Sequence, residues 1–240
     1  MYEKRSEEGK DTTVSRHFSK NFYQGHDILK SINSFIAIIR HAEKLIKTKN
    51  KDENSIILTE TGKKNAKDFG REFLTLYNDI SFIKTSPIKR CVKTAELILQ
   101  GANKNLEIIL SNNLGDPGVF VIDNNLASEL FKNNSCEKIV QYQIEGKNLD
   151  GMRDIKSGVR ILLEEILSNL KNIGERGLYI THDAILVPFI SYLTEDLDPT
   201  KNWIDYLEGI CIWTQNEDSF LMWRGKKYNI SNKVDILLKK

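Results

Sequence analysis

Apolar residues recur along the chain with spacings that predict alternating strands and helices. Residues 35–39 (FIAII) form a continuous apolar run of strand length, typical of a central strand covered on both faces. Residues 61–77 and 155–173 carry apolar side chains at helical spacing, which predicts amphipathic helices. By the same reasoning, further strands are expected at 80–84, 106–110 and 177–181, and further helices at 86–99 and 184–194.

The order of these elements indicates the fold class. Strands and helices alternate, which favours an α/β, three-layer sandwich in which a mainly parallel central sheet carries helices on both faces. Residues 210–214 and 220–223 predict an antiparallel hairpin near the C-terminal end. The helix at 86–99 has a clear start signal, because Ser86 is a favoured N-cap and Pro87 a favoured first residue.

The chain is expected to hold one domain from residue 34 to residue 240, since no linker interrupts the apolar segments. Residues 1–33 are interpreted as an N-terminal extension that is partly disordered, because the first dozen residues are mostly charged or small. The stretch from Phe18 to Ile32 carries apolar positions, so part of it is expected to pack on the domain. Residues 111–152 are rich in Gly, Pro and Asn and predict an irregular covering segment with two short helices.

Charge and hydropathy exclude several classes of partner. Thirty-five basic and thirty-three acidic residues are scattered along the chain, giving a net charge of +2 and no basic stripe, so no nucleic-acid partner is expected. No apolar run approaches the roughly 20 residues that span a bilayer, which indicates no membrane partner. The charged N-terminus lacks the apolar region of a signal peptide, and a cytoplasmic location is therefore expected.

Three cysteines, Cys91, Cys136 and Cys211, lie far apart in the sequence. Their odd number and spacing predict neither a disulfide framework nor a zinc site, so we expect no metal. Free cysteine is among the most buried residue types, and these three are interpreted as small core residues.

Polar residues suited to phosphate chemistry follow three of the predicted strands. Arg40 and His41 come directly after the first strand, Arg90 follows the strand at 80–84, and His182 follows the strand at 177–181. Ligands of open α/β sheets bind beyond the carboxyl ends of the strands, so two arginines and two histidines are expected together at one edge.

Two arginines and two histidines at one place can carry out chemistry that none of these residues indicates alone. An arginine fork matches the oxygens of a phosphoryl group, and a neutral imidazole is a competent nucleophile toward phosphorus. The helix that starts near Pro87 adds N–H donors. Taken singly, an Arg-His pair fits a surface turn, and His182 fits a buried core histidine. Together these residues indicate phosphoryl transfer.

The same segments resemble, in order, the signature segments of the histidine phosphatase superfamily, also called phosphoglycerate mutase-like. They are FIAIIRHAEK at 35–44, LTETG at 58–62, SPIKRCVKTAE at 86–96 and THD at 181–183. The resemblance extends from residue 34 to residue 225. It implies a phosphoglycerate mutase-like fold and a phosphatase that binds phosphate and needs no metal or organic cofactor. The chain length of 240 residues and a segment at 111–152 able to cover the site favour a phosphorylated small molecule as the substrate.

The resemblance also implies roles for individual residues. His41 would be the nucleophile that becomes phosphohistidine, and Arg40, Arg90 and His182 would bind the phosphoryl oxygens. Three further residues, Glu43, Lys44 and Ser86, are expected to border this phosphate site. Glu43 would orient its neighbours, whereas Lys44 either adds positive charge at the rim or is simply solvated.

The resemblance leaves two candidates for the proton donor. Some members use an acid in the loop after the third strand, which Asp116 matches, and others use an aspartate directly after the second histidine, which Asp183 matches. The explicit His-Asp pair favours Asp183. The simpler interpretation of Asp116 is a turn aspartate before Pro117, and that of Asp183 is a helix N-cap.

Departures from the family pattern bear on the activity. Ala42 replaces the usual glycine, and residues 44–47 (KLIK) replace the serine and asparagine of the mutases. A phosphatase acting on a phosphomonoester is therefore favoured. The alternatives are a protein phosphohistidine phosphatase, a phosphoglycerate mutase-like phosphotransferase, and a weakly active phosphate-binding regulatory module. The sequence leaves the substrate and the oligomeric state open.

Overall fold

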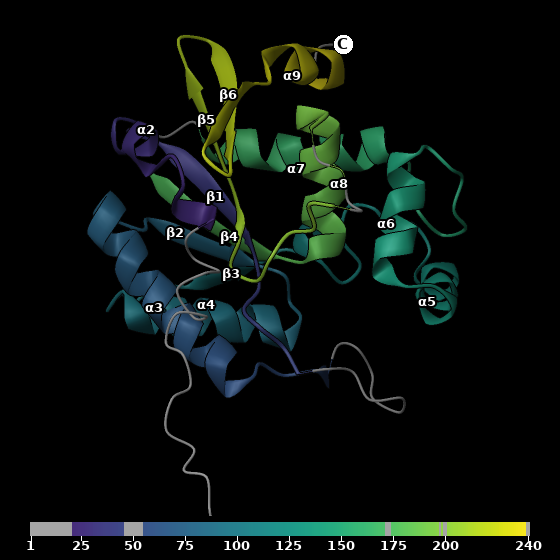
Figure 1. Ribbon diagram of the computed structural model, residues 1–240, viewed down its shortest axis with the longest axis horizontal. Helices are drawn as coiled ribbons and strands as arrows, with labels where there is room; N and C mark the ends of the chain where they lie inside the picture. Colours follow the sequence, from purple (N-terminus) through teal and green to yellow (C-terminus); the bar gives the residue numbers. More distant parts are fainter. Residues whose placement is uncertain (1–20, 46–54, 171–173, 197, 199–200, 239–240) are drawn as a thin grey trace, which may run out of the picture.

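The computed structural model describes residues 21–45, 55–170, 174–196, 198 and 201–238. Within these residues, seven strands form one sheet in the order β3-β2-β4-β1-β5-β6-β7. Helices cover both faces of the sheet, with α3 and α4 on one side and α7 and α8 on the other (Figure 1). The expected three-layer α/β architecture is confirmed.

The half of the sheet that ends at the predicted site is parallel. It comprises β1 (Phe35–Arg40), β2 (Phe82–Thr85), β3 (Ile108–Leu110) and β4 (Arg176–Thr181). β1 pairs with β4 from Phe35↔Arg176 to Arg40↔Thr181, so the two strands end side by side. Residues that follow β1 and β4 therefore leave the sheet next to each other.

The other half of the sheet is antiparallel, so the sheet as a whole is mixed. β5 (Gly209–Gln215) pairs with β1, and β6 (Asp218–Trp223) and β7 (Lys226–Asn229) complete a meander. The predicted hairpin is thus confirmed, and β7 was not foreseen. Because β5 runs against β1, the segment that enters β5 lies at the carboxyl end of β1.

Two apolar clusters form the core, one on each face of the sheet. The first lies under α7 (Ile155–Asn169) and α8 (Asp183–Thr194), with fully buried residues such as Leu162 and Phe189. The second lies under α3 (Glu60–Tyr77) and α4 (Lys89–Gly101), with Phe69 and Ile98 fully buried. The sheet supplies apolar side chains to both clusters, which explains the uninterrupted apolar run of β1.

The start of α4 differs from the sequence prediction. Ser86 is not its N-cap, because the helix begins at Lys89 and its N-cap is Ile88. The Ser86 hydroxyl is engaged elsewhere, accepting a hydrogen bond from the Ile88 N–H (3.3 Å) and lying 3.0 Å from His182 Nε2. The serine therefore belongs to the site rather than to the helix cap.

Part of the predicted N-terminal extension packs on the domain. In α2 (His26–Lys30) Leu29 is fully buried, and Phe22 and Ile32 beside it are also buried. The Phe22 ring lies 5.2 Å from that of Phe69 on α3, and the Tyr23 hydroxyl donates to the Phe69 carbonyl (3.0 Å). Residues 1–20, including the stretch expected to be disordered and Phe18, lie outside the described residues.

The predicted covering segment contains the two expected helices, α5 (Asn124–Asn133) and α6 (Cys136–Ile144). It starts with a short 3-10 turn at Asn112–Leu114 and ends where Val121 bridges Met152. Its residues Ala127, Ile139 and Val140 belong to the apolar cluster under α8. A short C-terminal helix, α9 (Ser231–Leu238), completes the described chain, in which no helix is both long and apolar enough to cross a membrane.

Candidate active site

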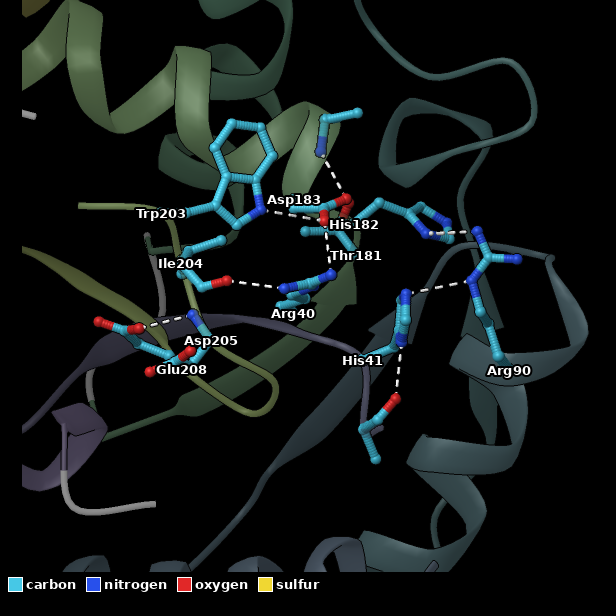
Figure 2. Close-up of polar contacts among 12 residues, drawn as sticks. Arg40, His41, Arg90, Thr181, His182, Asp183, Trp203, Ile204, Asp205 and Glu208 are labelled. Carbon is cyan, nitrogen blue, oxygen red and sulfur yellow. Dashed lines mark hydrogen bonds and ion pairs between the residues drawn. The ribbon is translucent and has the colours of Figure 1, made fainter. Parts of the chain in front are cut away.

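The structure places the two predicted arginines and two predicted histidines at one edge of the sheet, where Arg90 contacts both imidazoles. His41 follows β1, His182 follows β4, and Arg90 lies in the first turn of α4 (Figure 2). The imidazole rings are 5.3 Å apart between centroids. Both histidines and Arg90 are buried, so the charge of Arg90 acts on the two rings in a medium that screens it weakly.

The contacts of His41 define its proton arrangement. Nδ1 lies 2.8 Å from the Ala42 carbonyl, which can only accept, so Nδ1 carries a proton. Nε2 lies 3.1 Å from Arg90 Nε, which can only donate, so Nε2 carries a lone pair. The ring is therefore neutral, with its free lone pair directed toward Arg90.

The same reasoning applies to His182. Its Nδ1 lies 3.2 Å from a terminal nitrogen of Arg90, a donor, so Nδ1 is the acceptor. Its Nε2 then carries the proton and donates to the Ser86 hydroxyl at 3.0 Å. One guanidinium, that of Arg90, thus contacts both imidazoles and sets the tautomer of each.

Burial keeps both imidazoles neutral. It lowers the pKa of His41 well below the ordinary value, and His182, Arg90 and Arg40 lower it further. Burial and then Arg90 lower the pKa of His182 to about 3, although the Asp183 carboxylate opposes this shift. Neither ring is a cation near neutral pH.

Arg40 and Asp183 form an ion pair at the end of the same two strands. A terminal nitrogen of Arg40 lies 2.6 Å from Asp183 Oδ2, and its other terminal nitrogen donates to the Ile204 carbonyl at 2.7 Å. Burial raises the pKa of Asp183, but Arg40, His182 and the N–H groups of Ala184 and Trp203 together lower it by more, so the net pKa is below its usual range. Arg40 Nε is buried and has no hydrogen-bond partner within the described residues.

Residues of the LTETG and TAE motifs support the site from behind. The Thr94 hydroxyl accepts from the Ala42 N–H (3.1 Å) and donates to the Arg90 carbonyl (2.7 Å), which links β1 to α4. The Thr59 hydroxyl donates to Glu43 Oε2 at 2.6 Å and caps α3. A Cβ on Gly62 would lie 2.3 Å from the Glu43 carbonyl, so only glycine permits this approach.

The three residues predicted to border the phosphate site lie at different places around it. Ser86 contacts His182, as described above, whereas the Glu43 carboxylate points to the start of α3. Lys44 forms an isolated bridge with Leu58, and its backbone hydrogen-bonds the Tyr206 hydroxyl. Glu43 thus belongs to the support of the β1 end rather than to its contacts with His41.

Asp116 lies in a tight loop that touches His182. Gly115 before it has a φ of 142°, and a Cβ there would be 2.6 Å from Ser86 Oγ and 2.7 Å from His182 Nε2. The loop is fixed to the sheet, because the Thr181 hydroxyl donates to the Leu114 carbonyl at 2.6 Å. Asp116 itself is exposed.

A segment that the sequence prediction overlooked completes the site. Residues 203–208 precede β5, and three of them contact the Arg40–Asp183 pair. Trp203 Nε1 donates to Asp183 Oδ2 (3.3 Å), Ile204 accepts from Arg40, and the Tyr206 ring centroid lies 4.2 Å from the Arg40 guanidinium. The predicted antiparallel hairpin was the sequence signal that could have indicated this segment. Its first strand, β5, runs antiparallel to β1, so the residues before β5 must lie beside Arg40.

Metal-binding and thiol chemistry have little basis in the described part of the chain. No group of three or more His, Cys, Asp or Glu side chains there has the arrangement of a metal site. Cys91 and Cys211 are buried free thiols, and burial raises the pKa of Cys91 to about 12. The arrangement instead offers a neutral imidazole with a lone pair, surrounded by arginine donors.

Comparison with known proteins places this geometry in a family. Residues 36–208 match the model of the histidine phosphatase superfamily (branch 1). Comparison with curated protein sequences gave no match.

Similar solved structures share the fold at low sequence identity. Bacillus stearothermophilus YhfR is 17% identical with a TM-score of 0.57, covering 80% of this chain and 97% of that one. A phosphoglycerate mutase from Bacillus anthracis str. Sterne is 16% identical with a TM-score of 0.53, covering 82% and 91%. A phosphoserine phosphatase mutant from Entamoeba histolytica, in complex with phosphoserine, is 18% identical with a TM-score of 0.52, covering 82% and 97%.

Proposed function

Since the chain belongs to the histidine phosphatase superfamily, as its motifs predicted, we propose that it is a phosphatase that hydrolyses a phosphomonoester through a phosphohistidine on His41. The observation that carries this proposal is the pair of contacts on the His41 ring. Nδ1 donates to the Ala42 carbonyl, and Nε2 keeps its lone pair beside Arg90. A neutral, oriented imidazole is what an attack on phosphorus requires.

The first step exchanges hydrogen bonds at the arginines. When a phosphoryl group binds, its oxygens accept the N–H groups of Arg90 that now contact the two imidazoles. This exchange releases the Nε2 lone pair of His41 for in-line attack. Arg40 contributes its buried Nε and, after Arg90, the second positive charge of the site. Its pairing with Asp183 fixes the plane of its guanidinium.

The second requirement is a proton for the leaving oxygen, and we assign it to Asp116. Asp183 is held as a carboxylate by Arg40 and has no proton to give. Asp116 is exposed and follows Gly115, which lies against His182, so it belongs to the loop that borders the site. Water activated by the same carboxylate then hydrolyses the phosphohistidine and frees inorganic phosphate. The proposed course assigns no step to a metal.

The covering segment supports a small-molecule substrate. Its helix α6 packs beside α8, whose first residue is Asp183. Burial and then the Asp183 carboxylate raise the pKa of the Cys136 thiol, which indicates that the start of α6 lies near the site. A wall this close favours a compact phosphomonoester over a residue on a folded protein surface.

The test is to trap the intermediate. The protein is mixed with a labelled phosphomonoester, and the reaction is quenched in denaturant during turnover. We expect labelled phosphate to remain on the protein in an acid-labile, base-stable form, which is typical of phosphohistidine. His41→Ala should give no labelled protein and no turnover, with the fold intact by circular dichroism. Wild-type turnover in the His41→Ala variant would overturn the assignment.

The same protein preparation distinguishes the alternatives. A panel of phosphorylated metabolites and one phosphohistidine protein separates a small-molecule phosphatase from a protein phosphohistidine phosphatase. Transfer of label to a second hydroxyl rather than to water would indicate a phosphotransferase. Phosphate binding without turnover of any substrate would favour the regulatory module.

A further inference from the structure

The segment at residues 203–208 holds the Arg40–Asp183 pair from one side. Trp203 contacts the carboxylate, the Ile204 carbonyl accepts from the guanidinium, and the Tyr206 ring lies against the guanidinium (Figure 2 shows the first two contacts). Its main chain also pairs with Arg40 itself, since the Arg40 N–H donates to the Glu208 carbonyl (2.9 Å) and the Leu207 N–H donates to the Arg40 carbonyl (3.1 Å). The position of Arg40 therefore depends on this segment.

An ion pair between buried Glu208 and partly buried Arg224 holds the segment in turn. Glu208 is fully buried (0% exposed), and its Oε2 accepts from the Asp205 N–H at 2.7 Å and from Arg224 at 3.0 Å. Glu208 Oε1 is paired with Arg224 Nε. Arg224 also donates to the Trp203 carbonyl at 3.1 Å, so one guanidinium contacts both ends of the segment.

Arg224 reaches this position from a distant part of the sheet. It directly follows β6, at a φ of 46°, in the turn that leads into β7. The β6–β7 turn is therefore connected through Glu208 to the end of β1. A buried ion pair is weak evidence for stability, because desolvation offsets the attraction, and such pairs are more readily understood as fixing one geometry.

We propose that Glu208 and Arg224 are a positioning pair for the phosphate site. The pair fixes residues 203–207 so that Trp203, Ile204 and Tyr206 hold Arg40 and Asp183 in the orientation that receives phosphoryl oxygens. Neither residue acts on the substrate itself. This inference rests on the proposed function, because it assigns Arg40 to phosphate binding.

The experiment compares two variants of the pair with a matched control. Arg224→Lys keeps the charge but loses the fork that contacts Glu208 and Trp203 together, and Glu208→Gln keeps the shape but loses the charge. The control is Asp196→Asn, which removes partners of Lys226 and Tyr228 on β7 without touching residues 203–208. Binding of inorganic phosphate is measured by titration calorimetry, and turnover of an aryl phosphate is measured alongside, well below the melting temperature of each variant.

Both pair variants should weaken phosphate binding and lower kcat, on the order of 10²-fold in kcat if Arg40 moves by about 1 Å. The control should change neither quantity. In the double variant Asp183→Asn with Arg224→Lys, the loss of phosphate-binding free energy should be smaller than the sum of the losses in the two single variants, because both changes act through Arg40. A merely structural pair would instead lower the melting temperature and leave phosphate affinity and kcat unchanged.

Outcomes for this inference and for the proposed function are separable. Phosphate binding that weakens in both pair variants supports positioning even if the wild-type protein hydrolyses no ester, which would count against the phosphatase alone. Phosphate affinity equal to wild type in folded Arg224→Lys and Glu208→Gln overturns positioning, whatever the wild-type turnover. Full additivity with Asp183→Asn would also overturn it.

Discussion

At the scale of single residues, the two aspartates beside the phosphate site differ in what surrounds them. Asp183 is part-buried, lies 2.6 Å from Arg40, and accepts the Ala184 N–H and the Trp203 indole N–H. Asp116 is exposed in the loop that touches His182. The His-Asp motif drew attention to Asp183, but its partners suit a carboxylate that orients a cation.

The two aspartates should therefore respond differently to loss of charge. Asp116→Asn should lower kcat by roughly 10²–10⁴-fold for an alkyl phosphate, whose leaving oxygen needs a proton. It should have a much smaller effect on p-nitrophenyl phosphate, whose leaving group departs as an anion. Asp183→Asn should weaken phosphate inhibition and lower kcat to a similar extent for both substrates, because it frees Arg40 from its fixed orientation.

Steady-state kinetics with the two substrates checks this assignment. The ratio of the two kcat values is the informative quantity, since general loss of structure lowers both equally. A leaving-group dependence that appears in Asp183→Asn and not in Asp116→Asn would return the donor role to Asp183.

At the scale of elements, the loop before Asp116 depends on a glycine. Gly115 has φ 142° and leaves no room for a side chain between Ser86 Oγ and His182 Nε2. Gly115→Ala should push the loop away from His182, break the Ser86–His182 hydrogen bond, and strain the backbone at that φ. We expect a loss of kcat on the order of 10²-fold, because both His182 and Asp116 are displaced.

The measurement for this variant pairs activity with stability. Gly146→Ala is a matched control, since Gly146 has a φ of 72° but a Cβ there would meet nothing within 4 Å. Both variants carry the cost of a side chain at positive φ, so both should unfold more readily. A kcat unchanged by Gly115→Ala would show that the loop does not position the catalytic groups.

The element scale also shows what could be predicted from sequence. Apolar runs such as 35–39 and helical spacing such as 61–77 report burial locally, so β1 and α3 were anticipated within a few residues. The Ser86 N-cap prediction was wrong because the hydroxyl contacts His182, ninety-six residues away. The role of Glu208 was equally hidden, since its partner Arg224 becomes visible only once β5, β6 and β7 are folded together.

At the scale of the whole molecule, the site lies where the two halves of the sheet meet. β4 ends at Thr181 before His182, its parallel neighbour β1 ends at Arg40, and antiparallel β5 starts beside them at Gly209. Two strands leave the sheet at this edge and a third enters it. The parallel half therefore supplies the histidines, and the antiparallel half supplies the segment that holds Arg40.

The whole molecule must bear the cost of keeping His41 and His182 neutral, and this cost appears as a pH dependence of stability. In the folded protein both pKa values are lowered, that of His182 to about 3. In the unfolded chain an imidazole has a pKa of about 6.5. Below that pH the unfolded state therefore binds protons that the folded state does not bind. Unfolding then takes up protons, and the free energy of unfolding falls as pH falls.

The expected slope follows from linkage. Above pH about 6.5 both states are neutral at these rings and the two histidines contribute no slope. Below it, each contributes up to about 1.4 kcal/mol per pH unit, until carboxylates begin to titrate near pH about 4.3. Denaturant unfolding between these limits should thus become markedly easier with acidity, and His41→Asn with His182→Asn should flatten the dependence. The contrary outcome is an equal slope of unfolding free energy against pH in wild type and in the double variant. It would mean that these histidines are protonated as readily in the folded protein as in the unfolded chain. Burial would then not keep the nucleophile neutral.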